Sequence, residues 1–181
     1  MRKSIWRKIS SHKIYSCKYL DLFKDKVINQ LGKKVNYYYI HKKPFVAIIP
    51  KDAKGNIYFV RQYRYTLRKY TWEIPMGCKE SNESYLGAAK RELLEEASLK
   101  ARKWTKIGTE FVTTTAYPQH YRIYLAENLR PINKEPDPAE IDRVRKLTPK
   151  EIEKMILENQ ILGAPILASL YKYDLYQKLL K

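Results

Sequence analysis

The sequence is poor in cysteine and has no long tract of glycine, serine or proline. It holds two cysteines, Cys17 and Cys78, among 181 residues. Neither lies at zinc-site spacing from a histidine, so a zinc cluster is excluded and each thiol is expected to be buried or incidental. Because 44% of the residues are hydrophobic, a disordered chain is excluded as well. The length allows one sizeable domain with a small appended segment.

Long apolar runs are also missing. No window approaches the roughly 20 apolar residues of a membrane span, and the basic amino terminus lacks the apolar core of a signal peptide. We therefore expect a cytoplasmic protein with no membrane partner.

Acidic residues are scarce. The sequence has 19 Asp and Glu against 36 Lys and Arg, which gives a net charge of +17. Such a charge attracts nucleic acid and small phosphorylated substrates. The lysines are dispersed and no nucleic-acid motif accompanies them. Nucleic acid is therefore a possible partner, but the sequence does not favour it.

Residues 86–97 have the periodicity of an amphipathic helix. At about 100° per residue, Glu92, Glu95 and Glu96 lie beside or opposite a narrow apolar stripe. That stripe contains Leu86, Ala89, Leu93 and Ala97. Carboxylates three or four positions apart repel each other unless positive charge offsets them. Arg91 offsets part of this repulsion, and a divalent cation would offset the rest. Hard oxygen ligands favour Mg²⁺, with Mn²⁺ as the alternative.

A solvated helix face is the simpler interpretation of such a cluster, but the longer spacing argues against it. Five residues separate Gly77 from Glu83, and seven separate Glu83 from Arg91. The run then reads Arg-Glu-Leu, one residue, Glu-Glu, one residue, Ser-Leu. This pattern resembles the signature box of the Nudix hydrolases. Ser98 stands where the family has the Gly that closes the helix in a left-handed conformation, so we expect a shifted helix end and an intact metal site.

The resemblance implies an α/β fold, namely the Nudix fold, an α/β/α sandwich with a mixed β-sheet. A small N-terminal β-sheet segment is expected in addition. Residues 1–43 would form this segment, which would serve dimerisation and base binding, and residues 44–181 would form the hydrolase domain.

A second match lies just before the box. Gln62-Tyr63-Arg64, followed by Trp72, Glu73, Pro75 and Gly77, resembles the QYR…WELPAG pattern of the ADP-ribose pyrophosphatase branch. This resemblance implies that Arg64 contacts the substrate's phosphates or terminal ribose and that Tyr37 lies where a base-stacking side chain is expected. Glu73 is included among the substrate-binding residues. Tyr37 is equally compatible with an ordinary strand aromatic in a chain with 16 tyrosines.

The branch usually carries a Ser-Pro-Gly segment and an acid after the box helix. Residues 115–120 read Thr-Ala-Tyr-Pro-Gln-His instead. Pro118 could mark the same loop, and the missing glycine and acid bear on specificity for ADP-ribose.

Breaking a pyrophosphate requires an activated water and positive charge around the phosphate oxygens. Glu92 and Glu96 are the best direct metal ligands, because positions i and i+4 point the same way. Glu95 is either a third ligand or a partner of Arg91, and Arg91 is expected to orient the carboxylates. The resemblance adds the Met76 carbonyl as a ligand.

It also implies that Glu83 acts through water or by bracing the loop. As general base, the resemblance favours Glu140, with Asp137 and Asp142 as competitors. His120 or a box glutamate could take that role instead.

The other segments predict the frame of the fold. Two short strands are expected between residues 12 and 41, with a turn near residues 30–33, and a buried strand is expected at residues 45–50. Residues 135–147 are expected to form a loop. A helix should begin at Thr148 and Pro149, and a final helix should cover residues 164–180.

The sequence thus predicts a metal-dependent hydrolase that converts ADP-ribose to AMP and ribose 5-phosphate, acting as a homodimer. Alternatives are another nucleotide sugar such as GDP-mannose, removal of pyrophosphate from RNA 5′ ends, and a Nudix module that senses a nucleotide without cleaving it.

Overall fold

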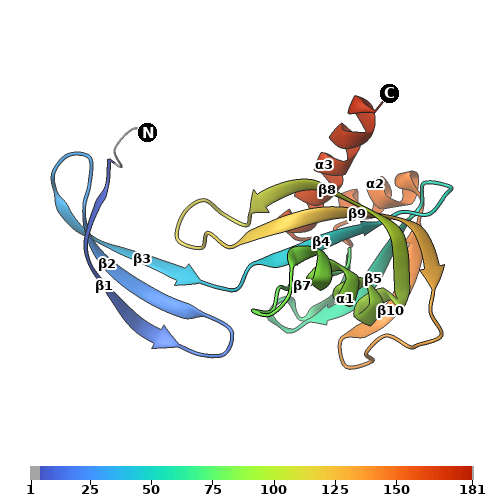
Figure 1. Cartoon of the computed structure of the whole chain (residues 1–181), viewed down its shortest axis with the longest axis horizontal. Coiled ribbons are helices and arrows are strands. Elements are labelled where there is room, and N and C mark those ends of the chain that lie inside the picture. The colour runs from blue at the N-terminus through green and yellow to red at the C-terminus, as the bar shows by residue number, and fades with distance from the viewer. Residues whose placement is uncertain (1–4, 181) are drawn as a thin grey trace. The chain divides into compact units, whose positions relative to one another are not determined.

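The computed structural model describes residues 5–180. The chain divides into two compact units (Figure 1). The first contains residues 5–44 and 111–119, and the second contains residues 45–110 and 120–180. Among the described residues, no helix has the length and apolar character needed to cross a membrane.

The first unit is built on an antiparallel sheet in the order β1-β2-β3. Its strands are β1 (Arg7–Ser16), β2 (Asp21–Ile28) and β3 (Lys34–His41). The prediction of two strands here was wrong, because residues 12–23 contain a turn in which the Cys17 N–H donates to the Leu20 carbonyl (3.0 Å). No Gly or Pro marks this turn. The sequence therefore gives no sign that β1 ends and β2 begins there, and the two strands were predicted as one.

The second unit contains a four-stranded sheet in the order β7-β4-β9-β8. Strand β4 runs parallel to β9 and antiparallel to β7, so the sheet is mixed as predicted. The predicted apolar strand is β4, and five of its six residues are buried. These strands are β4 (Phe45–Pro50), β7 (Met76–Cys78), β8 (Leu99–Phe111) and β9 (His120–Pro131).

A second sheet has the order β10-β5-β6. It contains β5 (Ile57–Arg64), β6 (Lys69–Glu73) and β10 (Ile141–Leu147), with the short 3₁₀ helix η1 (Tyr65–Leu67) between β5 and β6. The prediction of a loop through residue 147 was wrong, since residues 141–147 form β10. A register shift between Ile141 and Arg143 breaks the alternation that would have revealed the strand.

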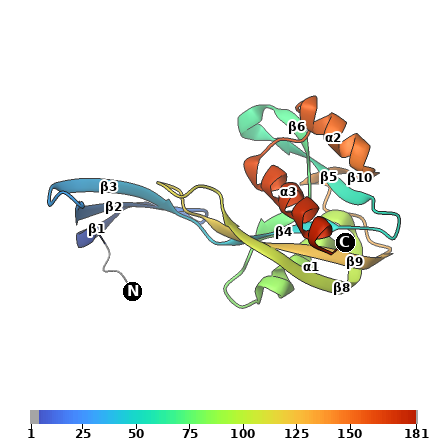
Figure 2. The ribbon, with the colours of Figure 1, turned by 90° about the horizontal axis from the view of Figure 1, so that it is seen from above.

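Three helices complete the second unit: α1 (Tyr85–Ala97), α2 (Pro149–Leu157) and α3 (Ala164–Leu179). Helices α1 and α3 lie on opposite faces of the four-stranded sheet (Figure 2). Val46 and Ile48 of β4 pack with Leu93 of α1 in the core. On the other face, the Tyr121 hydroxyl of β9 donates to the Pro165 carbonyl of α3 (3.4 Å). The predicted α/β/α sandwich with a small N-terminal sheet is confirmed.

The predicted start of α2 is confirmed. The Thr148 hydroxyl accepts from the Glu151 N–H (3.2 Å), and the Glu151 carboxylate accepts from the Thr148 N–H (2.8 Å). Together with Pro149 at the first helical position, this is a complete capping box.

Candidate active site

Helix α1 carries the acidic cluster. Its N-terminal cap is Ser84, whose hydroxyl accepts from the Gly87 N–H (2.9 Å). The helix ends at Ser98, which adopts the left-handed conformation with φ 53° and ψ 38°. The expected shift of the helix end was wrong, because Ser98 takes the conformation that glycine favours at the position that the box specifies.

Arg91 joins the helix to the preceding loop. Its guanidinium donates to Glu83 (2.8 Å), Glu92 (2.7 Å), Glu95 (3.0 Å) and the Cys78 carbonyl (2.9 Å). These bonds raise the pKa of Arg91, Glu83 being the largest cause, and Arg91 in turn lowers the pKa of Glu83. With its donors engaged in this way, Arg91 holds carboxylates in place, as the sequence predicts.

Glu83 also accepts a hydrogen bond from the Glu80 N–H (2.9 Å). The sequence left two roles open for Glu83, acting through water or bracing the loop. The contacts of Glu83 with Arg91 and with the Glu80 N–H are those of a residue that braces the loop. Glu95 is nearly half exposed at its side chain and pairs with Arg91, which corresponds to the second of its two predicted roles.

Glu92 and Glu96 are buried, with 8% and 5% of their surfaces exposed. A solvated helix face would leave both in water, so this interpretation does not hold for them. The Glu96 carboxylate accepts from the Gln62 side chain (3.1 Å) and from the Met76 N–H (2.9 Å). Burial raises the pKa of Glu96 to about 8, and the neighbouring Glu92 carboxylate adds to this. Burial also raises the pKa of Glu92.

Gly77 leaves the space in which the Glu92 carboxylate lies. A Cβ atom on Gly77 would come within 1.9 Å of Glu92 Oε1. The glycine of the box is therefore required for close approach of this carboxylate to the backbone of β7.

The donor set fits a hard divalent cation. Within residues 5–180, no three His, Cys, Asp or Glu side chains already converge as the ligands of one metal ion do. However, Glu92 and Glu96 are both buried and repel each other, and Glu96 lies against the backbone of Met76. Carboxylate and carbonyl oxygens are the ligands that Mg²⁺ and Mn²⁺ prefer, and a cation between the carboxylates would offset their desolvation and repulsion.

Arg64 and Glu73 form a bidentate pair. The Arg64 Nε donates to Glu73 Oε1 (2.6 Å), and a second bond joins Nη2 to Oε2. The Thr71 hydroxyl also donates to Glu73 (2.6 Å). This pairing raises the pKa of Arg64. The buried Glu73 therefore fixes the orientation of Arg64, which lines a cavity together with Glu92 and Glu96.

That cavity has a volume of about 460 Å³ and is also lined by Gln62, Met76 and Glu140. A neighbouring cavity of about 590 Å³ contains Glu92, Glu95, Glu96 and Glu140. Glu140 thus lines both cavities together with the two buried carboxylates. Its side chain has no hydrogen-bond partner among the described residues.

The competing base candidates are engaged elsewhere. Asp137 accepts from the Ala139 N–H (2.9 Å) and shapes the loop before β10. Asp142 binds Arg61 and lies 3.6 Å from the Arg143 guanidinium. The His120 ring bonds to the Tyr85 hydroxyl (2.6 Å).

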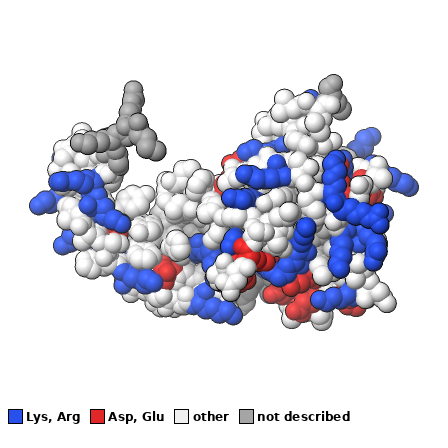
Figure 3. Space-filling model, in the orientation of Figure 1, with Lys and Arg blue, Asp and Glu red and all other residues white. Residues whose placement is uncertain are grey.

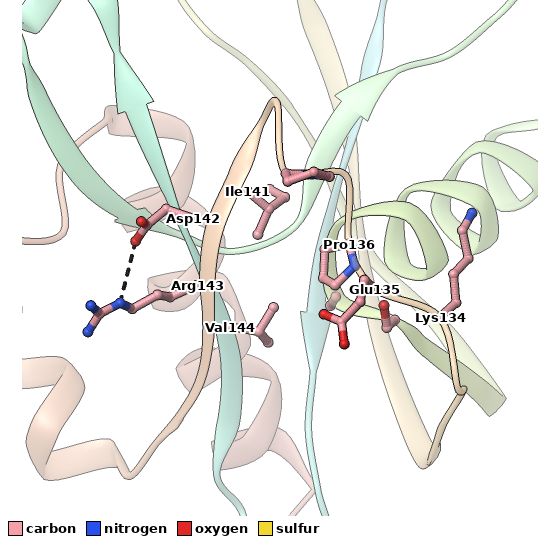
Figure 4. A pocket seen from close by; sticks show the side chains of 10 residues that line it. Lys134, Glu135, Pro136, Ile141, Asp142, Arg143 and Val144 are labelled. Carbon is pink, nitrogen blue, oxygen red and sulfur yellow. Dashed lines mark ion pairs between the residues drawn. The ribbon is translucent and has the colours of Figure 1, made fainter.

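Figure 4 places Asp142 and Arg143 on the wall of an adjoining cavity, opposite Lys134, Glu135 and Pro136. Its volume is about 610 Å³, and it also contains Ser98. Neither Glu92 nor Glu96 lines it, but it shares lining residues with the cavity that both of them line, so it adjoins the carboxylate site. The shared residues are Lys134, Glu135, Pro136, Pro138 and Ile141.

Tyr37 lies on β3 in the first unit. Its ring is 6.0 Å from that of Trp6 and 6.5 Å from that of Tyr39. It therefore belongs to an aromatic face, while the remaining predicted site residues lie in the second unit.

Two contacts made by residues of helix α1 were not predicted. Gln62 binds Glu96, and a signal was available, because Val60 and Gln62 alternate with outward positions on β5. The Arg122 guanidinium stacks on the Tyr85 ring at 3.8 Å at the start of α1, and no local pattern links these two residues.

Comparisons with known proteins agree with this geometry. The NUDIX domain family model matches residues 41–170. The ADP-ribose pyrophosphatase of Bacillus subtilis is 30% identical over 159 residues, which is 86% of this chain and 85% of the relative. That of Mycobacterium tuberculosis is 30% identical over 165 residues, or 88% and 79%.

A solved structure titled "Crystal structure of ADP compounds hydrolase" matches with a TM-score of 0.82 over 96% of this chain and 94% of that one. At 15% identity, this match supports the fold alone. The family match covers well over half of the sequence and includes the helix on which Glu92 and Glu96 lie buried. The chain belongs to the Nudix family of pyrophosphohydrolases, whose members typically use a divalent metal.

Proposed function

We propose that this chain hydrolyses the pyrophosphate bond of a nucleoside diphosphate linked to a sugar, with ADP-ribose as the first candidate. The products are AMP and ribose 5-phosphate. The observation that carries the proposal is the pair of buried carboxylates, Glu92 and Glu96, beside Arg64 in one cavity. The name shared by the two relatives supports the choice of ADP-ribose.

In this proposal Glu92, Glu96 and the Met76 carbonyl hold Mg²⁺, with Mn²⁺ as a substitute and Glu95 at the periphery. When bound, the metal clamps the phosphates and acidifies the attacking water. Arg91 and Glu83 keep the carboxylates and the loop in register, and Arg64, oriented by Glu73, binds the phosphates or the terminal ribose.

Glu140 is proposed as the general base. It takes a proton from water as the new P–O bond forms and the bridging P–O bond breaks. Its place between both cavities and the engagement of Asp137, Asp142 and His120 with other groups support this choice.

The test is product release from a panel of ADP-ribose, GDP-mannose and triphosphorylated RNA, with and without Mg²⁺. We expect Mg²⁺-dependent AMP release from ADP-ribose with the highest kcat/KM. Higher turnover of GDP-mannose or RNA would show that the compound in question, and not ADP-ribose, is the preferred substrate. Tight binding with no turnover of any substrate would make the chain a sensing module and refute the proposal. Glu153→Gln, an exposed glutamate on α2, serves as the matched control for site variants.

We also propose that the first unit supplies the base contact, through Tyr37, and that the chain acts as a homodimer. Tyr37→Ala should raise KM for adenine nucleotides several-fold with little change in kcat, because stacking contributes about 1–3 kcal/mol per base. An unchanged KM would assign Tyr37 to sheet packing. Sedimentation at several protein concentrations tests the dimer.

A further inference from the structure

The cavities at the buried carboxylates follow one another along the second unit. The one of about 460 Å³ that Arg64 lines is called here the Arg64 cavity, and the one of about 590 Å³ beside it is called the acidic cavity. Both are lined by Glu92, Glu96 and Glu140. The acidic cavity in turn shares five lining residues, Lys134 among them, with the adjoining cavity of Figure 4. The three cavities therefore form a row with the acidic cavity in the middle.

The acidic cavity contains little positive charge. Among the described residues, ten line it, and six of them are Asp or Glu, whereas Lys134 is the only Lys or Arg. The six acids are Glu92, Glu95, Glu96, Glu135, Asp137 and Glu140. A diphosphate bound in this cavity needs positive charge around its oxygens. A metal ion held by Glu92 and Glu96 would supply part of that charge, and Lys134 is the cation that the cavity itself adds.

The side chain of Lys134 is available to an anion. Lys134 is exposed and forms no ion pair within residues 5–180, so no internal ion pair has to break when an anion binds. Its backbone is fixed, because the Lys134 N–H donates to the Ile132 carbonyl (2.8 Å) and the Ile132 N–H donates to the Ser98 carbonyl (2.9 Å). Lys134 is therefore held beside the C-terminal end of α1, the helix that carries the buried carboxylates.

The two outer cavities of the row have different linings. The Arg64 cavity includes Tyr63, which is 51% exposed, and an aromatic side chain suits a nucleoside. In the described part of the chain, no aromatic residue lines the adjoining cavity. There, Glu135 points toward Val144 across the cavity, while Lys134 points the other way (Figure 4). A carboxylate accepts hydrogen bonds from hydroxyl groups, so this lining suits a sugar better than a base.

We propose that the adjoining cavity is the subsite for the sugar phosphate half of the substrate, and that Lys134 binds the phosphate of this half at the boundary with the acidic cavity. Arg64 binds the phosphate of the nucleoside half on the other side. An ammonium group offers three donors and a compact positive charge to phosphate oxygens. The nature of the two halves rests on the proposed function.

The first experiment measures binding of ribose 5-phosphate and of AMP to the full chain by calorimetry with Mg²⁺ present. Lys134→Ala should weaken the binding of ribose 5-phosphate about 10- to 100-fold, the range expected for one hydrogen bond between charged groups. It should leave the affinity for AMP nearly unchanged. Lys134→Arg keeps a cation and should retain most of the affinity for ribose 5-phosphate. Arg64→Lys should weaken AMP instead, because an ammonium group cannot replace a two-pronged guanidinium.

Lys90→Ala is the matched control. Lys90 is an exposed residue of α1 that lines none of the three cavities, so its removal lowers the net charge by the same amount and should change neither affinity. An equal loss of both affinities in Lys134→Ala would show general attraction of anions and overturn the proposal. So would an unchanged affinity for ribose 5-phosphate, a loss confined to AMP, or no binding of ribose 5-phosphate to the wild-type chain.

The second experiment tests the adjoining cavity itself. Val144→Phe reduces its volume and should weaken ribose 5-phosphate without weakening AMP, and unfolding temperature checks that the variant folds. Pro138→Phe, on the exposed loop that lines the same cavity, is used if Val144→Phe does not fold. Unchanged binding of ribose 5-phosphate in the folded variant would place the sugar elsewhere and overturn the proposal.

The third experiment measures hydrolysis of ADP-ribose by the same proteins with Mg²⁺ present. Lys134→Ala should lower kcat/KM at least about 10-fold, and Lys90→Ala should not change it. If the wild-type chain hydrolyses no compound of the substrate panel, the proposed function fails. The affinities for ribose 5-phosphate and AMP still decide the role of Lys134 in that case.

Discussion

Glu96, proposed above as a metal ligand, lowers the stability of the metal-free chain. Its pKa in the folded chain, about 8, lies above its ordinary value of 4.5 because burial disfavours the charged form. The folded state therefore binds this proton more tightly than the unfolded state does. When no metal is bound, the stability that protonated Glu96 gives the folded chain is therefore lost as the pH rises from about 4.5 through 8.

Glu96→Gln should thus stabilise the metal-free chain at pH 9, by on the order of 2 kcal/mol, and have little effect near pH 5. The amide can keep both hydrogen bonds if the Gln62 amide turns over. Urea unfolding in EDTA at the two pH values measures this effect. The same variant should lose about 10³-fold or more in turnover, as expected for a lost metal ligand. An equal stability difference at both pH values, or near-normal turnover, would contradict this assignment.

Ser98 is a second residue that lowers the stability of the folded chain. It holds a left-handed conformation that costs a non-glycine residue about 1–2 kcal/mol, and its hydroxyl oxygen is buried without a partner in the described part of the chain. Ser98→Gly should raise stability by about 0.5–1 kcal/mol after the added flexibility of the unfolded chain is subtracted. Thermal unfolding measures the gain.

Asn159→Gly is the control for this substitution, since Asn159 also has a positive φ of 56° but tolerates it better than serine. A gain in the control equal to that of Ser98→Gly would argue against strain at the helix end.

At the level of elements, the approach of β7 to α1 fixes the site. Gly77→Ala places a methyl group where the Glu92 carboxylate lies. Because the carboxylate is the end of a flexible side chain, it can move away at little cost in stability. We expect a loss of at least 10-fold in kcat with an unfolding temperature close to that of the wild type. Activity assays and thermal unfolding test this together.

Gly87→Ala, in the first turn of α1, is the matched control. Its Cβ would meet the Ser84 hydroxyl at 3.3 Å, and alanine favours the helix. It should keep full activity, and equal losses in both variants would contradict the proposed contact between Gly77 and Glu92.

The elements also mark where prediction from sequence works. Helix α1 and strand β4 were predictable because their periodicity or apolar run is unbroken. Strand β10 was not, because a bulge shifts its alternation. The turn at residues 17–20 escaped prediction because it is closed by a backbone hydrogen bond without glycine or proline.

For the whole molecule, charge is the main unexplained property. Lysine and arginine side chains are spread over much of the face in Figure 3, while acidic side chains gather near one edge of the second unit. With a net charge of +17, the chain should attract an anionic substrate over long range. Raising NaCl from about 50 to 500 mM shortens the screening length severalfold, so kcat/KM for ADP-ribose should fall several-fold while kcat changes little. A flat salt profile would show that the excess charge does not steer substrate.

The sequence by itself determined the catalytic class. The spacing from Gly77 to Leu99 is local, and a helix places the carboxylates of this segment on one of its sides. No tertiary information was therefore needed to predict Glu92, Glu96 and Arg91. The tertiary structure decided which carboxylates are buried, that Glu73 orients Arg64 and that Gln62 holds Glu96. These properties depend on pairings between strands distant in sequence, where burial and the choice of hydrogen-bond partner are set by neighbours that no local pattern encodes.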